Sequence, residues 1–267
     1  MKPTLPIATA AEAPLKVRPT LAGVWAGLVF LLLTLSAFVV VLLTPGKRNR
    51  SAIARRAARI FLALAGIDLQ LEHLERLPVG ACVVVANHAS YLDGVVIKAA
   101  LPARFTFIIK KEILHVPVAG LFLRLIGSEF VDRFNRHSGA IDTRRLLRAA
   151  GNGQSLGFFP EGTIPSAIGI AQFHTGAFVI AARAGLPVVP IAICGTRAAL
   201  PLGSIWLKPG KVTLSILPAV SAEGKKSQAA AVALRDAARL TILSALREPD
   251  LTAGAQPTVT QPRRATS

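Results

Sequence analysis

Residues 21–44 form an uninterrupted apolar segment, LAGVWAGLVFLLLTLSAFVVVLLT, in which no side chain carries a charge. As a helix this segment would be about 35 Å long, which is enough to cross the hydrocarbon core of a bilayer. It is also longer than the apolar centre of a cleaved signal peptide. We therefore predict a membrane-associated helix here, preceded by a flexible arm over residues 1–19.

Positive charge is denser on the carboxyl side of this apolar segment than on its amino side. The tendency of basic residues to stay inside predicts that everything downstream lies in the cytosol, at the inner (cytoplasmic) membrane. Residues 51–66 begin basic and end apolar, which suits a second helix at the interface with its arginines toward lipid headgroups. A single span and a two-helix hairpin both remain open. The basic residues are Lys2, Lys16 and Arg18 before the segment, and Lys47, Arg48, Arg50, Arg55, Arg56 and Arg59 after it.

The chain as a whole is both apolar and basic. Hydrophobic residues make up 52% of it, and 31 Lys and Arg against 14 Asp and Glu give a formal net charge of +17. This combination favours contact with an anionic membrane surface over contact with nucleic acid. Aromatic residues are only 6%, and neither a zinc-finger spacing nor an RNA-binding aromatic motif is present. The two cysteines, Cys82 and Cys194, lie in apolar strand-like runs and are predicted to be buried thiols, neither a disulfide nor a metal site.

From residue 67 onward, short apolar runs alternate with longer helical patterns, which is typical of an α/β fold. We predict a layered, mostly parallel or mixed sheet flanked by helices over residues 67–248, after membrane-associated helices at 20–66. A tail at 249–267, rich in Pro, Thr and Ala, is predicted to be disordered. Predicted strands are 67–72, 81–86, 105–110, 129–132, 155–159, 187–193 and 211–217, and predicted helices are 91–101, 116–126, 136–151, 173–185 and 226–247.

The stretch VVVANHASYLDG, residues 83–94, ends a predicted buried strand on His88 and places Asp93 five residues later. Residues five apart on a regular helix point about 140° away from each other, so the two cannot touch within one helix. If His88 ends the strand and Asp93 lies in the first turn of the next helix, the carboxylate can hydrogen-bond one imidazole nitrogen. The other nitrogen is then free to take a proton. On its own this spacing is common and typical of a structural histidine.

Two further polar clusters follow other predicted strands. FFPEGT (158–163) carries Glu161, and SEFVDR (128–133) ends on Asp132 and Arg133. Each cluster alone is typical of a solvated loop charge or a salt bridge. Because α/β folds place their sites at the carboxyl ends of neighbouring strands, the three together indicate a functional site.

The order of these motifs resembles the glycerolipid acyltransferases of the 1-acylglycerol-3-phosphate acyltransferase type, the PlsC-like family, over about residues 80–220. NHASYLD matches the family's Asn-His-x4-Asp block, and FPEGT matches its third block. KKEILHVPVAGLFLRLIGSEFVDR is similar to the second block and VVPIAI to the fourth. The apolar N-terminal segments are similar to a membrane-docking two-helix element found in some members.

The resemblance implies transfer of a fatty acyl group from a thioester, on CoA or acyl carrier protein, to the hydroxyl of a lysophospholipid. The product would be phosphatidic acid if the acceptor is 1-acylglycerol-3-phosphate. No metal and no cofactor beyond the acyl donor is implied. His88 would be the general base and Asp93 its orienting partner. The substrate-binding residues implied are Lys110, Lys111, Arg133, Glu161, Gly162 and Thr163.

Two departures from the family pattern remove cations that could hold a phosphate. Ile164 follows FPEGT where arginine is frequent, and QFHTG places His174 where lysine is common. Another lysolipid acceptor, such as a lyso-ornithine lipid, therefore stays open. A non-catalytic, membrane-anchored lipid-binding protein would need neither His88 nor Asp93. A serine hydrolase is disfavoured because no Gly-x-Ser-x-Gly elbow is present, whereas a hydrolase in which His88 and Asp93 activate water stays open.

Overall fold

The computed structural model describes residues 20–132, 136–222, 224 and 226–252, and within them the chain forms one seven-stranded mixed sheet. The strand order is β1-β7-β6-β2-β5-β3-β4. Every neighbouring pair is parallel except β6 and β7. The α/β class and the mostly parallel sheet predicted from the sequence are therefore confirmed. The strands are β1 (Ile67–Glu72), β2 (Val83–Ala86), β3 (Phe105–Lys110), β4 (Glu129–Val131), β5 (Ser155–Phe158), β6 (Val188–Cys194) and β7 (Gly210–Ile216).

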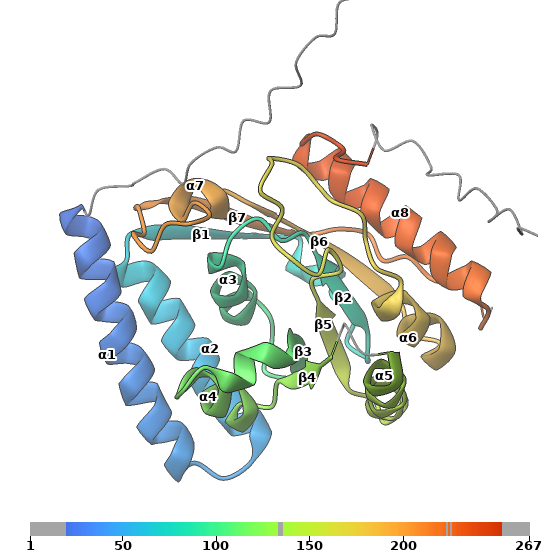
Figure 1. Ribbon diagram of the computed structural model, residues 1–267, viewed down its shortest axis with the longest axis horizontal. Coiled ribbons are helices and arrows are strands. Elements are labelled where there is room, and N and C mark those ends of the chain that lie inside the picture. The colour runs from blue at the N-terminus through green and yellow to red at the C-terminus, as the bar shows by residue number, and fades with distance from the viewer. Residues whose placement is uncertain (1–19, 133–135, 223, 225, 253–267) are drawn as a thin grey trace, which may run out of the picture.

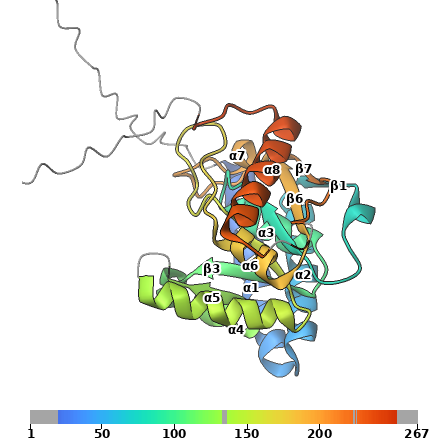
Figure 2. The same cartoon turned by 90° about the vertical axis from the view of Figure 1, so that its right-hand side faces the viewer.

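Helices cover both faces of this sheet (Figure 1). Helix α3 (Leu92–Ala100) packs with an N-terminal helix pair on one face, whereas α6 (Gly176–Ala184) and α8 (Gln228–Leu246) pack on the other. Figure 2 shows this second face toward the viewer, with α5 (Arg136–Gly151) beside α6. The described part of the chain also contains α4 (Ala119–Leu125), α7 (Thr196–Ala199) and the 3-10 turns η1 (Leu74–Arg76) and η2 (Lys111–His115).

The N-terminal segments form a helical hairpin. Helix α1 (Leu21–Leu43) begins at Thr20, whose hydroxyl accepts the Gly23 N–H, and α2 (Lys47–Leu64) begins after a turn at Gly46 with φ of 82°. The Trp25 indole donates to the Leu64 carbonyl at 2.9 Å and ties the two helices together. Among the described residues, one helix, α1, is sufficiently long and apolar to cross a membrane.

Two of the arginines of α2 form hydrogen bonds with the sheet domain. Arg55 and Arg59 donate to the carbonyls of Ala100 and Ala99 at 3.2 and 2.8 Å. These carbonyls end α3, where the last turn leaves backbone oxygens without helical partners and a cation is favoured. The predicted orientation of the arginines toward lipid headgroups is therefore not found for these two, which fasten the hairpin to the sheet domain.

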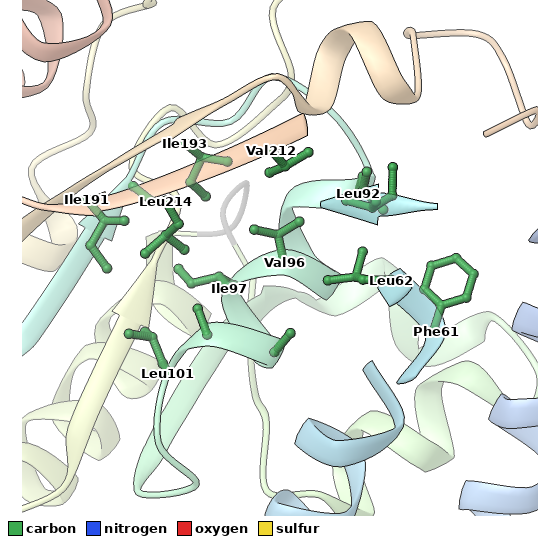
Figure 3. Close-up of a cluster of buried hydrophobic side chains, with 14 of the residues drawn as sticks. Phe61, Leu62, Leu92, Val96, Ile97, Leu101, Ile191, Ile193, Val212 and Leu214 are labelled. Carbon is green, nitrogen blue, oxygen red and sulfur yellow. The ribbon is translucent and has the colours of Figure 1, made fainter. Parts of the chain in front are cut away.

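The main core lies between α3, the helical hairpin and one face of the sheet (Figure 3). Its members come from strands and helices far apart in the sequence. Their alternation along the strands places one set on this face and the other under α6 and α8. The labelled side chains are Phe61, Leu62, Leu92, Val96, Ile97, Leu101, Ile191, Ile193, Val212 and Leu214.

Two sequence-based predictions are corrected by the structure. Cys82 is buried as predicted, but Cys194 is exposed because it is the last residue of β6. The tail predicted to be disordered from residue 249 is packed through residue 252: the Ile170 N–H donates to the Pro249 carbonyl at 3.0 Å, and the Leu251 N–H to the Ile170 carbonyl at 3.2 Å. Backbone pairing with a distant loop, invisible to local composition, holds these residues. Residues 1–19 and 253–267 lie outside the described residues.

Candidate active site

His88 lies just beyond the carboxyl end of β2, in the turn that leads into α3. Strands β2, β5, β3 and β4 run in the same direction, so their carboxyl ends share one edge of the sheet. The chain leaves β2 through α3 on one face and β5 through α6 on the other. The crevice between two such departures is where open α/β sheets bind ligands.

Asp93 lies in the first turn of α3, and its Oδ2 is 2.9 Å from His88 Nδ1. The Asp93 side chain is fully buried, whereas that of His88 is 20% exposed. The strand-end histidine and first-turn aspartate are thus arranged as the spacing required. Their catalytic roles stay predictions.

Three donors converge on one oxygen of Asp93. Besides His88 Nδ1, the N–H groups of Ala89 and Ser90 donate to Oδ2 at 2.7 and 2.8 Å. An oxygen that accepts two backbone N–H groups acts as an acceptor toward the imidazole as well, so Nδ1 carries the proton and Nε2 is left as a base. Asp93 Oδ1 is buried and has no hydrogen-bond partner among the described atoms.

The imidazole ring is also fixed from the side of β5. Phe159, which follows β5, stacks on it with ring centroids 4.3 Å apart and an interplanar angle of 20°. Two residues later, Glu161 Oε1 accepts the His88 backbone N–H at 2.7 Å, and Oε2 accepts the Ala171 N–H at 2.9 Å. Glu161 is buried, and this burial raises the pKa of its carboxyl, opposed by the two backbone hydrogen bonds. In the structure Glu161 therefore holds the backbone of the loops around His88 and Ala171, and its contact with substrate stays a prediction.

Asn87 is a site residue to which the sequence assigned no separate role. Its amide forms two hydrogen bonds with the backbone of Ile193 in β6, one donated from Nδ2 at 2.9 Å and one accepted by Oδ1 at 2.8 Å. The side chain thereby continues the pairing of β2 with β6 one residue beyond the strand. The position of Asn87 directly before His88 was the available signal, but its partner lies 106 residues away.

A cavity of about 900 Å³ opens beside His88 and extends along α3 toward the helical hairpin. Its walls are mostly apolar side chains from α1, α2, α3, β3 and the segment around α4. Of the predicted substrate-binding residues, Lys110, Gly162 and Thr163 line this cavity together with His88, as does Ile164. Lys111 is exposed and is not among the lining residues. Arg133 lies outside the described residues.

A smaller cavity of about 280 Å³ adjoins the first, with Phe159 and Gly162 contributing to both. Its polar lining includes Asp132, Asp142 and His174. His174, which stands where the family commonly has lysine, therefore lies beside the site. In the described residues the site thus combines an oriented histidine, a large and mostly apolar cavity, and a smaller adjoining cavity that contains a few polar side chains.

Comparison with known proteins places this arrangement in a family. Residues 68–194 match the family model described as Acyltransferase. The chain is 30% identical to the 1-acyl-sn-glycerol-3-phosphate acyltransferase of Haemophilus influenzae over 182 residues, covering 66% of this chain and 73% of that protein. It is 37% identical over 136 residues to a chloroplastic protein of the same activity, BAT2, from Brassica napus, covering 50% of this chain and 39% of that one. The chain belongs to the acyltransferase family, in the 1-acylglycerol-3-phosphate, PlsC-like group predicted from its motifs.

The fold is similar to that of the crystal structure of the 1-acyl-sn-glycerophosphate acyltransferase, PlsC, from Thermotoga maritima. The TM-score is 0.69 at 23% identity, covering 84% of this chain and 95% of that one. This chain spans about half the length of several relatives, 39% and 48% of the plant and algal proteins and 57% of the yeast one.

Proposed function

We propose that this protein transfers a fatty acyl group from an acyl thioester to the free hydroxyl of 1-acylglycerol-3-phosphate, giving phosphatidic acid for phospholipid synthesis. The observation that carries the proposal is the His88–Asp93 pair at the edge of a large apolar cavity. The names of the relatives support the same reaction and the same acceptor.

In this reaction, the bare Nε2 of His88 takes the proton of the acceptor hydroxyl as its oxygen attacks the thioester carbonyl carbon. Asp93 holds the ring and stabilises the imidazolium that forms. When the tetrahedral adduct collapses, the carbon–sulfur bond breaks and the sulfur takes the proton back from the imidazolium. The products are an ester and a free thiol, and the histidine returns to its starting state.

The apolar cavity provides room for an acyl chain close to the base. Burial of a chain on such walls contributes about 0.8 kcal/mol per methylene removed from water, and it aligns the carbonyl with the attacking hydroxyl. The positive charge of Lys110 is placed at the same cavity, and Lys111 and Arg133 complete the set proposed to hold the phosphate. Gly162 and Thr163 are proposed to contact the glycerol-phosphate end.

The acyl donor is proposed to be acyl-CoA or acyl carrier protein, with no metal or further cofactor. The protein is proposed to lie at the cytoplasmic membrane with its sheet domain in the cytosol. Helix α1 carries no charge, and only 22% of its most apolar stretch is buried inside the protein. This exposed apolar surface supports attachment through burial in lipid. Such attachment is insensitive to salt, whereas a purely electrostatic attachment is screened.

The test uses the purified full chain with a panel of lysolipids and both donor types, with products identified by mass. We expect transfer to 1-acylglycerol-3-phosphate, and loss of transfer in His88→Ala with the fold retained. Transfer only to a lysolipid without phosphate, such as a lyso-ornithine lipid, would show that 1-acylglycerol-3-phosphate is not the acceptor. That result would agree with the presence of Ile164 and His174 where the family commonly has cations. Thioester consumption without any acceptor would indicate a hydrolase, and no consumption would indicate a lipid-binding protein.

A further inference from the structure

Lys98 places a cationic group on the wall of the apolar cavity, and the reaction above does not use it. Lys98 lies on α3, five residues after Asp93, which contacts the catalytic histidine. At 1.5 Å per residue its Cα is about 7.5 Å farther along the helix axis than that of Asp93. Both His88 and Lys98 line the cavity, and this offset along α3 separates the backbone position of Lys98 from that of the residue that contacts His88.

The ammonium group has few partners. Lys98 Nζ donates to Ser51 Oγ at 2.6 Å and lies 5.6 Å from the ring centroid of Phe107. Within the described part of the chain it forms no ion pair with a carboxylate. Burial, followed by the nearby charge of Arg55, lowers the pKa of Lys98 to about 8. The group is therefore still mostly protonated at neutral pH.

An ammonium has three N–H donors, and Ser51 satisfies one of them. Before an acyl chain enters the cavity, water can serve the others. A saturated acyl chain that fills the cavity would exclude that water and offer no acceptor, which leaves a buried charge short of hydrogen bonds. A chain carrying an oxygen at the right depth would exclude the same water and replace its hydrogen bond.

We propose that Lys98 is a specificity determinant that binds a hydroxyl group on the acyl chain, so that the protein prefers hydroxylated acyl donors over saturated ones of equal length. The inference rests on the proposed function. Because the Cα of Lys98 lies about 7.5 Å farther along α3 than that of Asp93, the favoured hydroxyl is in the interior of the chain rather than beside the thioester.

The experiment compares acyl thioesters of one chain length, either saturated or with a hydroxyl beside the carbonyl, in mid-chain or at the end. The purified full chain is given 1-acylglycerol-3-phosphate, and kcat/KM is measured for each donor. A charge-assisted hydrogen bond predicts a preference of about tenfold or more for the mid-chain hydroxyl. In Lys98→Met, a similar-sized apolar side chain, this preference should vanish while the rate with the saturated donor is kept or increased.

Lys211→Met is the matched control, because this exposed lysine lies on β7, outside the cavity lining, and it should keep the wild-type preference. If Lys98→Met fails to fold, Lys98→Gln replaces it and should retain at most a few-fold preference. Equal rates of the wild type on all donors, or a preference that survives in the Lys98 variants, overturns the proposal. A change only in preferred chain length overturns it too. Failure of the wild type to transfer any donor instead overturns the proposed function.

Discussion

Replacing Asp93 by asparagine separates the two tasks that we propose for its carboxylate, orienting the imidazole and balancing its charge. In the structure a single oxygen accepts from His88 Nδ1 and from two backbone N–H groups, while Oδ1 has no partner among the described atoms. Asparagine has the same shape, so its one carbonyl oxygen can occupy the Oδ2 position. The amide nitrogen then takes the place of Oδ1, and the proton stays on His88 Nδ1.

The expected loss of rate follows from the charge alone. A hydrogen bond to a charged group contributes about 1.5–3 kcal/mol, against about 0.5–1.5 kcal/mol for a neutral one. The imidazolium formed in the transition state therefore loses about 1–2 kcal/mol of stabilisation, which is a factor of about 5–30 in rate. Removal of the base itself in His88→Ala should cost about 10²–10⁴. The buried amide without a partner lowers the free energy of unfolding by about 1–3 kcal/mol.

The assay measures thiol release with 1-acylglycerol-3-phosphate as acceptor, and thermal unfolding of each variant is followed in the same detergent. Asp93→Asn should fall between the wild type and His88→Ala in kcat/KM and remain folded. Asp93→Ala, which leaves all three donors without their acceptor, should be much less stable. A folded Asp93→Asn protein as inactive as His88→Ala would refute the reasoning, because the amide would then have turned its nitrogen toward the ring.

Three further predictions concern residues around this pair. In Glu161→Gln one acceptor oxygen must serve two backbone donors, so the free energy of unfolding should fall by about 1–3 kcal/mol. The kcat should fall by a larger factor than the KM changes. Full stability in chemical denaturation would contradict this prediction. In Gly157→Ala the new Cβ would lie 2.8 Å from the Phe107 ring, which lines the cavity and is expected to shift into it. In a series of donors of different chain length, the highest kcat/KM should therefore move toward shorter chains. An unchanged profile would show that the ring does not shift into the cavity. Burial lowers the pKa of Lys98 from its usual 10.5 to about 8, so the unfolded chain binds more protons than the folded one between these pH values. The stability of the wild type should therefore rise with pH in this window relative to Lys98→Met. A stability difference that does not change from pH 7 to 10.5 would count against the buried charge.

The sequence predicted the sheet well because each strand carries its own signal. Apolar runs such as 83–86 and 188–193 read as strands without reference to any neighbour, and all the strands of the described sheet fall on predicted segments. The contact of His88 with Asp93 was also local, spanning five residues. A short separation and a turn between strand and helix leave few geometries, so the pattern alone could fix it.

What the sequence could not give were the contacts between distant segments. Glu161 was recognised as a site residue, but its bond to the His88 backbone spans 73 residues, and nothing in FPEGT indicates that partner. Cys194 resembles a core thiol because its neighbours are apolar, yet it lies where β6 ends. From the sequence Lys98 is an ordinary charge on a helix, and only the packing of α2 and β3 around it shows that this cation is partly buried.

A continuous set of hydrogen bonds links the backbone of His88, the proposed base, to the carboxyl-terminal residues that follow α8. Arg239 in α8 pairs with Asp250 at 2.9 Å and donates to the carbonyls of Ile170 and Ala171 at 2.9 and 3.0 Å. Ala171 in turn donates its N–H to Glu161, which accepts the backbone N–H of the histidine. A base that follows the end of a strand is not held by the backbone hydrogen bonds of the sheet, yet proton transfer requires it to keep one position. Residues 249–252, which composition assigned to a disordered tail, therefore help to hold the loop that supports the proposed active site.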